Sequence, residues 1–110
     1  MRFLLVCLGG AAGSGARYLI GTATPHGTLA VNIIGSFFIA MAMESMRVSD
    51  LRLLLVTGVL GGFTTYSAFN QETLEYMRAG AWGSAAANVA VTVAACLAAG
   101  WLGVWVARRL

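Results

Sequence analysis

Four apolar runs, each about as long as a lipid bilayer is thick, account for almost all of this 110-residue chain. A membrane-spanning helix needs about 20 mostly apolar residues, and such runs lie at about 2–20, 28–46, 51–77 and 82–106. Only 10% of the residues are charged, against about 25% in a soluble domain. We therefore expect an all-α, four-transmembrane-helix protein of one domain, residues 1–110, whose first run is retained as a span.

The third run differs from the others at its centre. Residues 58–65 read GVLGGFTT, with three glycines and two threonines in the middle of a span. Glycine and β-branched residues weaken a helix, and unpaired backbone is costly in lipid. A break at membrane depth is tolerated where neighbouring protein covers it or where it lines a polar site. The sequence predicts a third helix that is broken in this stretch.

Small residues indicate close helix packing. Gly9 and Gly13 form a GxxxG pair in the first run, and such pairs let two helix backbones approach closely. One copy of four short helices has little interior, so we expect the chain to associate with itself.

Polar and aromatic residues at membrane depth form the candidate site. One face of the second helix carries Thr28, Asn32, Gly35 and Ser36, and one face of the third carries Tyr66, Phe69 and Glu72. An Asn side chain donates two hydrogen bonds without carrying charge, and the edge of an aromatic ring is electropositive. These groups suit a small anion. Spacing alone leaves two interpretations open, a stripe that packs helices together and the lining of an ion path.

The arginines lie mostly near the ends of the apolar runs. Arg17 either extends to the membrane surface or attracts anions to a vestibule. Glu44 and Arg47 are three residues apart, which predicts an ion pair. Most of the arginines fall on the side of the two chain ends, which favours a cytoplasmic N-terminus.

Several functions are excluded by what the sequence lacks. The single histidine, His26, has no Cys, Asp or Glu at metal-ligand spacing, and no nucleophile–base pair is visible. The glycines at 58–62 lack the lysine of a phosphate-binding loop. The net charge of +3 is too small and too scattered for nucleic-acid binding. We expect a protein that is not an enzyme.

Three stretches together resemble one known family. They are GAAG at 10–13 with Arg17-Tyr18, GTLAVNIIGSF at 27–37, and GVLGGFTTYSAF at 58–69 followed by Glu72-Thr73. The second and third are specific, and with the first they extend over most of the chain. In their order and spacing the chain resembles the Fluc/CrcB family of small fluoride channels.

The resemblance implies a passive channel that exports cytoplasmic fluoride across the inner (plasma) membrane. It implies an antiparallel, dual-topology homodimer with two pores, although the arginine distribution favours one orientation. The departures from the family pattern at Tyr66 and Ala68 leave a homologous subunit open as the partner. It also implies a structural sodium ion at the dimer interface, held by the backbone carbonyls of Gly61 and Thr64.

By the same resemblance, six residues line the fluoride pore and one lies in its vestibule. The pore residues are Asn32, Tyr66, Ser67, Phe69, Glu72 and Asn88, and the vestibule residue is Arg17. Family members usually have Phe at position 66 and Thr at position 68, where this chain has Tyr66 and Ala68. The tyrosine keeps the ring edge and adds a hydroxyl group.

Two other classes of protein share part of this pattern. A small multidrug exporter shares the length and the four spans, but it depends on a carboxylate in the first helix, where this chain has none. A non-conducting accessory subunit or membrane scaffold would explain the composition and the small residues. It gives no reason for aligned aromatic and carboxylate residues after a glycine-rich stretch.

Overall fold

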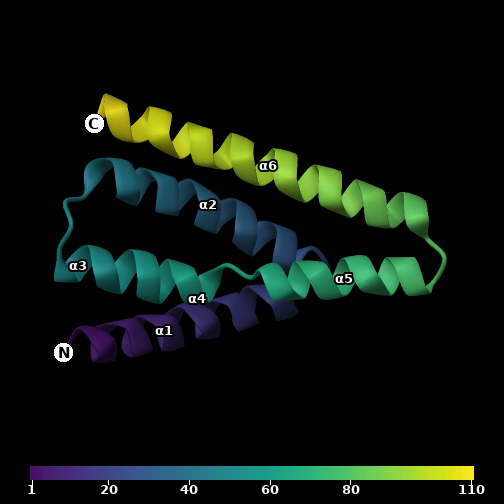
Figure 1. Cartoon of the computed structure of the whole chain (residues 1–110), viewed down its shortest axis with the longest axis horizontal. Helices are drawn as coiled ribbons and strands as arrows, with labels where there is room; N and C mark the ends of the chain where they lie inside the picture. The colour runs from purple at the N-terminus through teal and green to yellow at the C-terminus, as the bar shows by residue number, and fades with distance from the viewer.

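The computed structural model describes residues 1–110 and contains helices only (Figure 1). Three helices are regular: α1 (Arg2–Ala23), α2 (Gly27–Ser45) and α6 (Trp82–Arg109). The remaining span, residues 50–78, joins α3 (Asp50–Arg52), the π-helix η1 (Leu53–Leu60), α4 (Gly61–Phe63) and α5 (Tyr66–Arg78). All four spans are long and apolar enough to cross a membrane. The predicted all-α class with four membrane-length helices is confirmed.

The backbone conformation of the third span departs from a regular α-helix in two places. It winds as a π-helix through η1, where the N–H of Gly61 bonds the carbonyl of Val56, five residues back. Helix α4 ends at Phe63, and Thr64 and Thr65 are extended, with φ/ψ of −84°/154° and −149°/119°. Helix α5 then begins at Tyr66. The glycines of this stretch lie in helical turns, and the extended backbone falls on the two threonines.

The four spans lie side by side in a flat bundle. Helix α6 runs along α2, and α1 lies against η1 and α4. Both chain ends and the α2–α3 connection lie at one end of the bundle, and the α5–α6 turn lies at the other (Figure 1). We call the first of these the terminal end.

Helix α1 meets the third span through glycines, as the GxxxG pair predicts. A Cβ atom placed on Gly9 would lie 2.6 Å from the carbonyl oxygen of Leu54, and one on Gly58 would lie 2.9 Å from the Cα of Gly9. Both distances are shorter than carbon contacts allow. Only residues without a side chain permit this approach of two backbones.

Most of the apolar surface of the chain is exposed. Only 13 of 110 residues are buried, and large side chains such as Leu8, Leu97 and Trp101 are each more than 65% exposed, at 66%, 70% and 68%. Contiguous apolar surface of this extent marks a membrane or protein contact. The surface is suited to lipid and to other subunits, and the interior is small.

One predicted ion pair is wrong. Glu44 binds Arg108 on α6, with 2.9 Å between its Oε1 and the arginine Nε, and not Arg47. Helix α2 ends at Ser45, and Met46 is extended. Arg47 therefore lies outside the helix, where the three-residue spacing no longer brings it to Glu44, whereas the last turn of α6 passes beside α2.

Candidate functional site

Asn32 binds the extended backbone that follows α4. Its Nδ2 donates to the carbonyl oxygen of Thr65 at 3.0 Å, and its Oδ1 accepts from the Thr65 N–H at 2.8 Å. Asn32 is 7% exposed. A helix break at membrane depth needs partners for the backbone groups it frees, and this one side chain supplies a donor and an acceptor to the same residue.

A groove opens beside this contact, between α2, the extended threonines, α5 and α6. It has a volume of about 430 Å³, and we call it the break groove. Its polar lining includes Asn32, Ser36, Thr64, Thr65 and Thr92, and its apolar and aromatic lining includes Ile39, Tyr66, Phe69, Val93, Cys96 and Leu97. The lining carries hydroxyl and amide groups but no charged side chain.

Tyr66 and Phe69 meet in the break groove in an edge-to-face arrangement. Their ring centroids lie 5.7 Å apart with 61° between the planes. Phe69 is buried at 9% exposure, and Tyr66 is 76% exposed. The Phe69 ring is thus fixed by packing within the chain, while the Tyr66 ring is accessible from outside the groove.

Arg17 reaches the end of α4. Its Nε donates to the carbonyl oxygen of Gly62 at 3.1 Å, and the Ser14 hydroxyl donates to the same oxygen at 3.5 Å. A cation is favourable at the C-terminal end of a helix, where carbonyls lack intrahelical partners. Arg17 places a positive charge beside the break.

Glu72 and Asn88 lie together in a second hollow of about 300 Å³ near the α1–α2 turn, which also contains His26 and Glu75. Asn88 donates from Nδ2 to the Thr73 hydroxyl of α5 at 2.9 Å. This contact ties α6 to α5 beyond the break groove.

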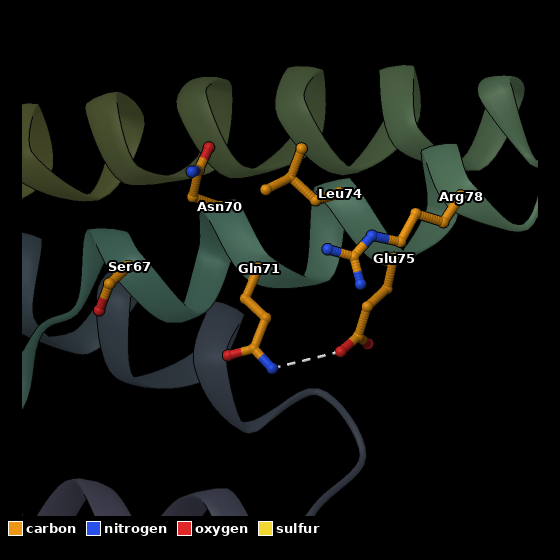
Figure 2. A pocket seen from close by; sticks show the side chains of 6 residues that line it. All are labelled: Ser67, Asn70, Gln71, Leu74, Glu75 and Arg78. Carbon is orange, nitrogen blue, oxygen red and sulfur yellow. Dashed lines mark hydrogen bonds between the residues drawn. The ribbon is translucent and has the colours of Figure 1, made fainter.

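Ser67 faces a third hollow, of about 360 Å³, on another side of α5 (Figure 2). Its lining is Ser67, Asn70, Gln71, Leu74, Glu75 and Arg78. Within it, Gln71 donates to Glu75 at 3.3 Å. This polar face of α5 is exposed, since no other helix of the chain covers it. The six predicted pore residues are thus divided among three hollows of the chain.

The carbonyls of Gly61 and Thr64 are suited to a hard cation. No hydrogen bond reaches the Thr64 carbonyl. In a continuous helix the Thr65 N–H would bond the Gly61 carbonyl, but here it bonds Asn32. Two backbone oxygens are part of the set of six or more that a hard cation prefers. The two carbonyls thus fit part of the ligand set of such an ion.

Two further residues of the site, Thr65 and Thr92, do not stand out in the sequence as site residues. The Thr65 hydroxyl caps α5 by accepting from the Ala68 N–H at 3.2 Å. Its signal is a threonine directly before a helical run, the usual N-cap position. Thr92 is buried in the break groove at 8% exposure, and its signal is a hydroxyl within a long apolar helix.

Four membrane-length apolar helices around a small interior define a multi-pass membrane protein. The family model described as "CrcB-like protein, Camphor Resistance (CrcB)" matches residues 4–104. The chain belongs to this family, which confirms the resemblance in its motifs.

Curated relatives match over nearly the full length. A protein of Sorangium cellulosum is 47% identical over 99% of this chain and 96% of its own. One of Anaeromyxobacter dehalogenans is 49% identical over 99% and 97%, and one of Geobacter sulfurreducens is 43% identical over 97% of both. Each is named "Fluoride-specific ion channel FluC". These names describe ion channels, a class that is not enzymatic.

Proposed function

We propose that this protein is a passive, fluoride-selective channel of the plasma membrane that lets cytoplasmic fluoride leave the cell. The observation that carries the proposal is the break groove, in which Asn32, buried and neutral, lies beside the Tyr66–Phe69 pair. The full-length relatives named as fluoride-specific channels support the choice of ion.

The physical demand on such a path explains this lining. Moving a small ion from water into a low-dielectric medium costs on the order of 20 kcal/mol unless new contacts offset it, and conduction requires sites that also release the ion. One N–H of Asn32 binds Thr65, and the amide has a second N–H for an anion. This N–H and the electropositive ring edges attract fluoride more weakly than a fixed arginine would.

We further propose that the channel is an antiparallel dimer with two pores, formed with a second copy or with a homologous subunit. Two observations support a second subunit. The break groove leaves Tyr66 largely exposed, and the polar face of α5 around Gln71 and Glu75 is uncovered. Polar side chains within a span are tolerated where protein or a water-filled path covers them.

In this dimer the carbonyls of Gly61 and Thr64 from both subunits would hold a structural sodium ion. The ion would supply fixed positive charge at the centre of the assembly. The Thr64 carbonyl, which accepts no hydrogen bond, supports this assignment, and Arg17 adds its own charge beside the same break.

The test is fluoride efflux from liposomes that contain the purified protein, followed with a fluoride electrode and with chloride efflux as the selectivity control. We expect fast fluoride efflux without chloride efflux. Phe69→Ile, which removes the buried ring of the groove, should slow efflux at least tenfold. Phe3→Ile is the matched control, because Phe3 is 78% exposed at the start of α1 and should leave the rate unchanged.

The same samples separate the alternatives. Light scattering should give the mass of two chains. No efflux from a folded dimer would refute the channel and favour a membrane scaffold. A folded monomer without efflux would point instead to a homologous partner, and efflux that appears on its co-expression would establish that assembly. Equal slowing by Phe3→Ile and Phe69→Ile would remove the groove from the path.

A further inference from the structure

The two ends of the bundle differ in charge. The terminal end carries five arginines against two acids, namely Arg2, Arg47, Arg52, Arg108 and Arg109 against Glu44 and Asp50. The opposite end carries Arg78 against Glu72 and Glu75. In an antiparallel dimer the terminal ends of the two subunits meet opposite surfaces of the membrane. Each of these ends carries an excess of positive charge, which attracts anionic lipid headgroups.

A hollow of about 450 Å³ lies at the terminal end, between α1, α2 and η1. We call it the arginine hollow. Arg2, Ser49, Asp50 and Arg52 form its polar part. Its apolar part is formed mainly by Met43, Val48, Leu53 and Val56. A polar rim above an apolar wall at the membrane surface matches the two chemical halves of a lipid.

The guanidinium group of Arg52 makes two contacts within the chain and has further N–H donors that are free. Its Nη1 donates to the carbonyl of Met46 at 3.3 Å, and its Nη2 contacts the sulfur of Met43 at 2.8 Å. A guanidinium has five N–H groups in a planar fork that matches phosphate oxygens. Most of these groups remain free, and the two contacts orient the fork at the rim of the arginine hollow.

Arg2 is available as a second phosphate ligand. Its Nε lies 3.4 Å from the Asp50 carboxylate, but the two side chains are 82% and 66% exposed. An ion pair this exposed contributes little, so a phosphate can displace it at small cost. The arginine hollow then has a positive net charge, because it contains Arg2 and Arg52 but only one acid, Asp50.

We propose that the arginine hollow binds an anionic phospholipid. Arg2 and Arg52 bind the headgroup phosphate, and an acyl chain lies along Leu53 and Val56. The occupant is a lipid because the apolar wall, which includes Leu53 and Val56, adjoins the positive rim of the same hollow. The inference is independent of the transported ion.

The test is the binding of a phosphatidylglycerol with a fluorescent acyl chain to the purified protein in neutral detergent. Unlabelled phosphatidylglycerol, phosphatidylcholine and glycerol phosphate serve as competitors. Phosphatidylglycerol should compete best. Arg2→Gln and Arg52→Gln should each weaken binding about tenfold, as expected for the loss of a hydrogen bond to a charged phosphate. Arg47→Gln removes the same charge from the same end without touching the arginine hollow, and it should change binding less than twofold.

Arg2→Gln gives the deciding result, because Arg2 is too exposed for its loss to disturb the fold, whereas Arg52 also supports the α2–α3 turn. Equal competition by phosphatidylcholine would overturn the proposal. So would a loss in Arg47→Gln as large as in Arg2→Gln, which would indicate general charge attraction. Competition by glycerol phosphate as strong as that of the lipid would indicate an anion site without a lipid chain.

Discussion

Replacing Asn32 by Ala should destabilise the third span at its extended residues. The substitution removes both hydrogen bonds between the side chain and Thr65, at 3.0 and 2.8 Å. A hydrogen bond contributes about 1 kcal/mol net, and side-chain bonds within membrane proteins average about 0.6 kcal/mol. The Thr65 N–H and carbonyl would also lose partners in a part-buried place. We therefore expect a loss of about 2 kcal/mol in the free energy of unfolding.

The assay is equilibrium unfolding in mixed micelles, followed by circular dichroism as the denaturing detergent is increased. Ser36→Ala is the control, because Ser36 lines the same groove one helical turn further and makes no hydrogen bond through its side chain. Its effect should stay within about 0.5 kcal/mol. Hydrogen exchange gives a local measurement, since about 2 kcal/mol corresponds to about thirtyfold faster exchange of the Thr65 amide.

Equal stability of the Asn32→Ala and Ser36→Ala proteins, with unchanged exchange at Thr65, would refute this reasoning. Asn32 would then line the groove without holding the backbone. Loss of stability without faster exchange at Thr65 would place its contribution elsewhere in the fold.

Two further predictions concern packing and the proposed ion. Gly13→Ala should cost about 3 kcal/mol, because its Cβ would overlap the Val59 carbonyl oxygen. Gly15→Ala should raise the melting temperature slightly, because nothing lies within 4 Å of its added Cβ and alanine favours a helix more than glycine does. Equal melting temperatures of the two variants would mean that α1 and the third span are not in backbone contact. Exchanging sodium for N-methylglucamine during purification and reconstitution should slow fluoride efflux, and full efflux in its absence would count against the ion at Gly61 and Thr64.

Much of the fold follows from composition and periodicity. Long apolar runs with few charges predict four membrane-length helices. A helix satisfies all its backbone hydrogen bonds within one run, which lipid requires because it offers no partners for free N–H and carbonyl groups. The close approach at Gly9 also follows from the small residues. The site of the extended backbone does not follow as directly. Glycines weaken an isolated helix, but Gly58 is held in a helical turn by its contact with α1.

The candidate site was predicted as a set of residues but not as an arrangement. Asn32 stands out as a polar group at membrane depth, yet its partner Thr65 depends on how α2 lies against the third span. The same holds for Glu44, whose partner on α6 is 64 residues away. Spacing along one helix predicts neighbours on that helix only. The division of Ser67, Phe69 and Glu72 among three hollows arises from which sides of α5 the other helices cover.

The π-helical stretch η1 has a consequence for how the gene can change. A π-helix holds about one more residue per turn than an α-helix, so η1 tolerates a different number of residues from a regular helix. Deleting one residue there would let the backbone relax to ordinary α-helical winding. Seven residues of α-helix turn through about the same angle as the eight residues of η1, so Gly62 and Phe63 would keep their contact with α1. A one-codon deletion in η1 would therefore disturb this junction less than a deletion in a regular helix, where each lost residue rotates the side chains beyond it by about 100°.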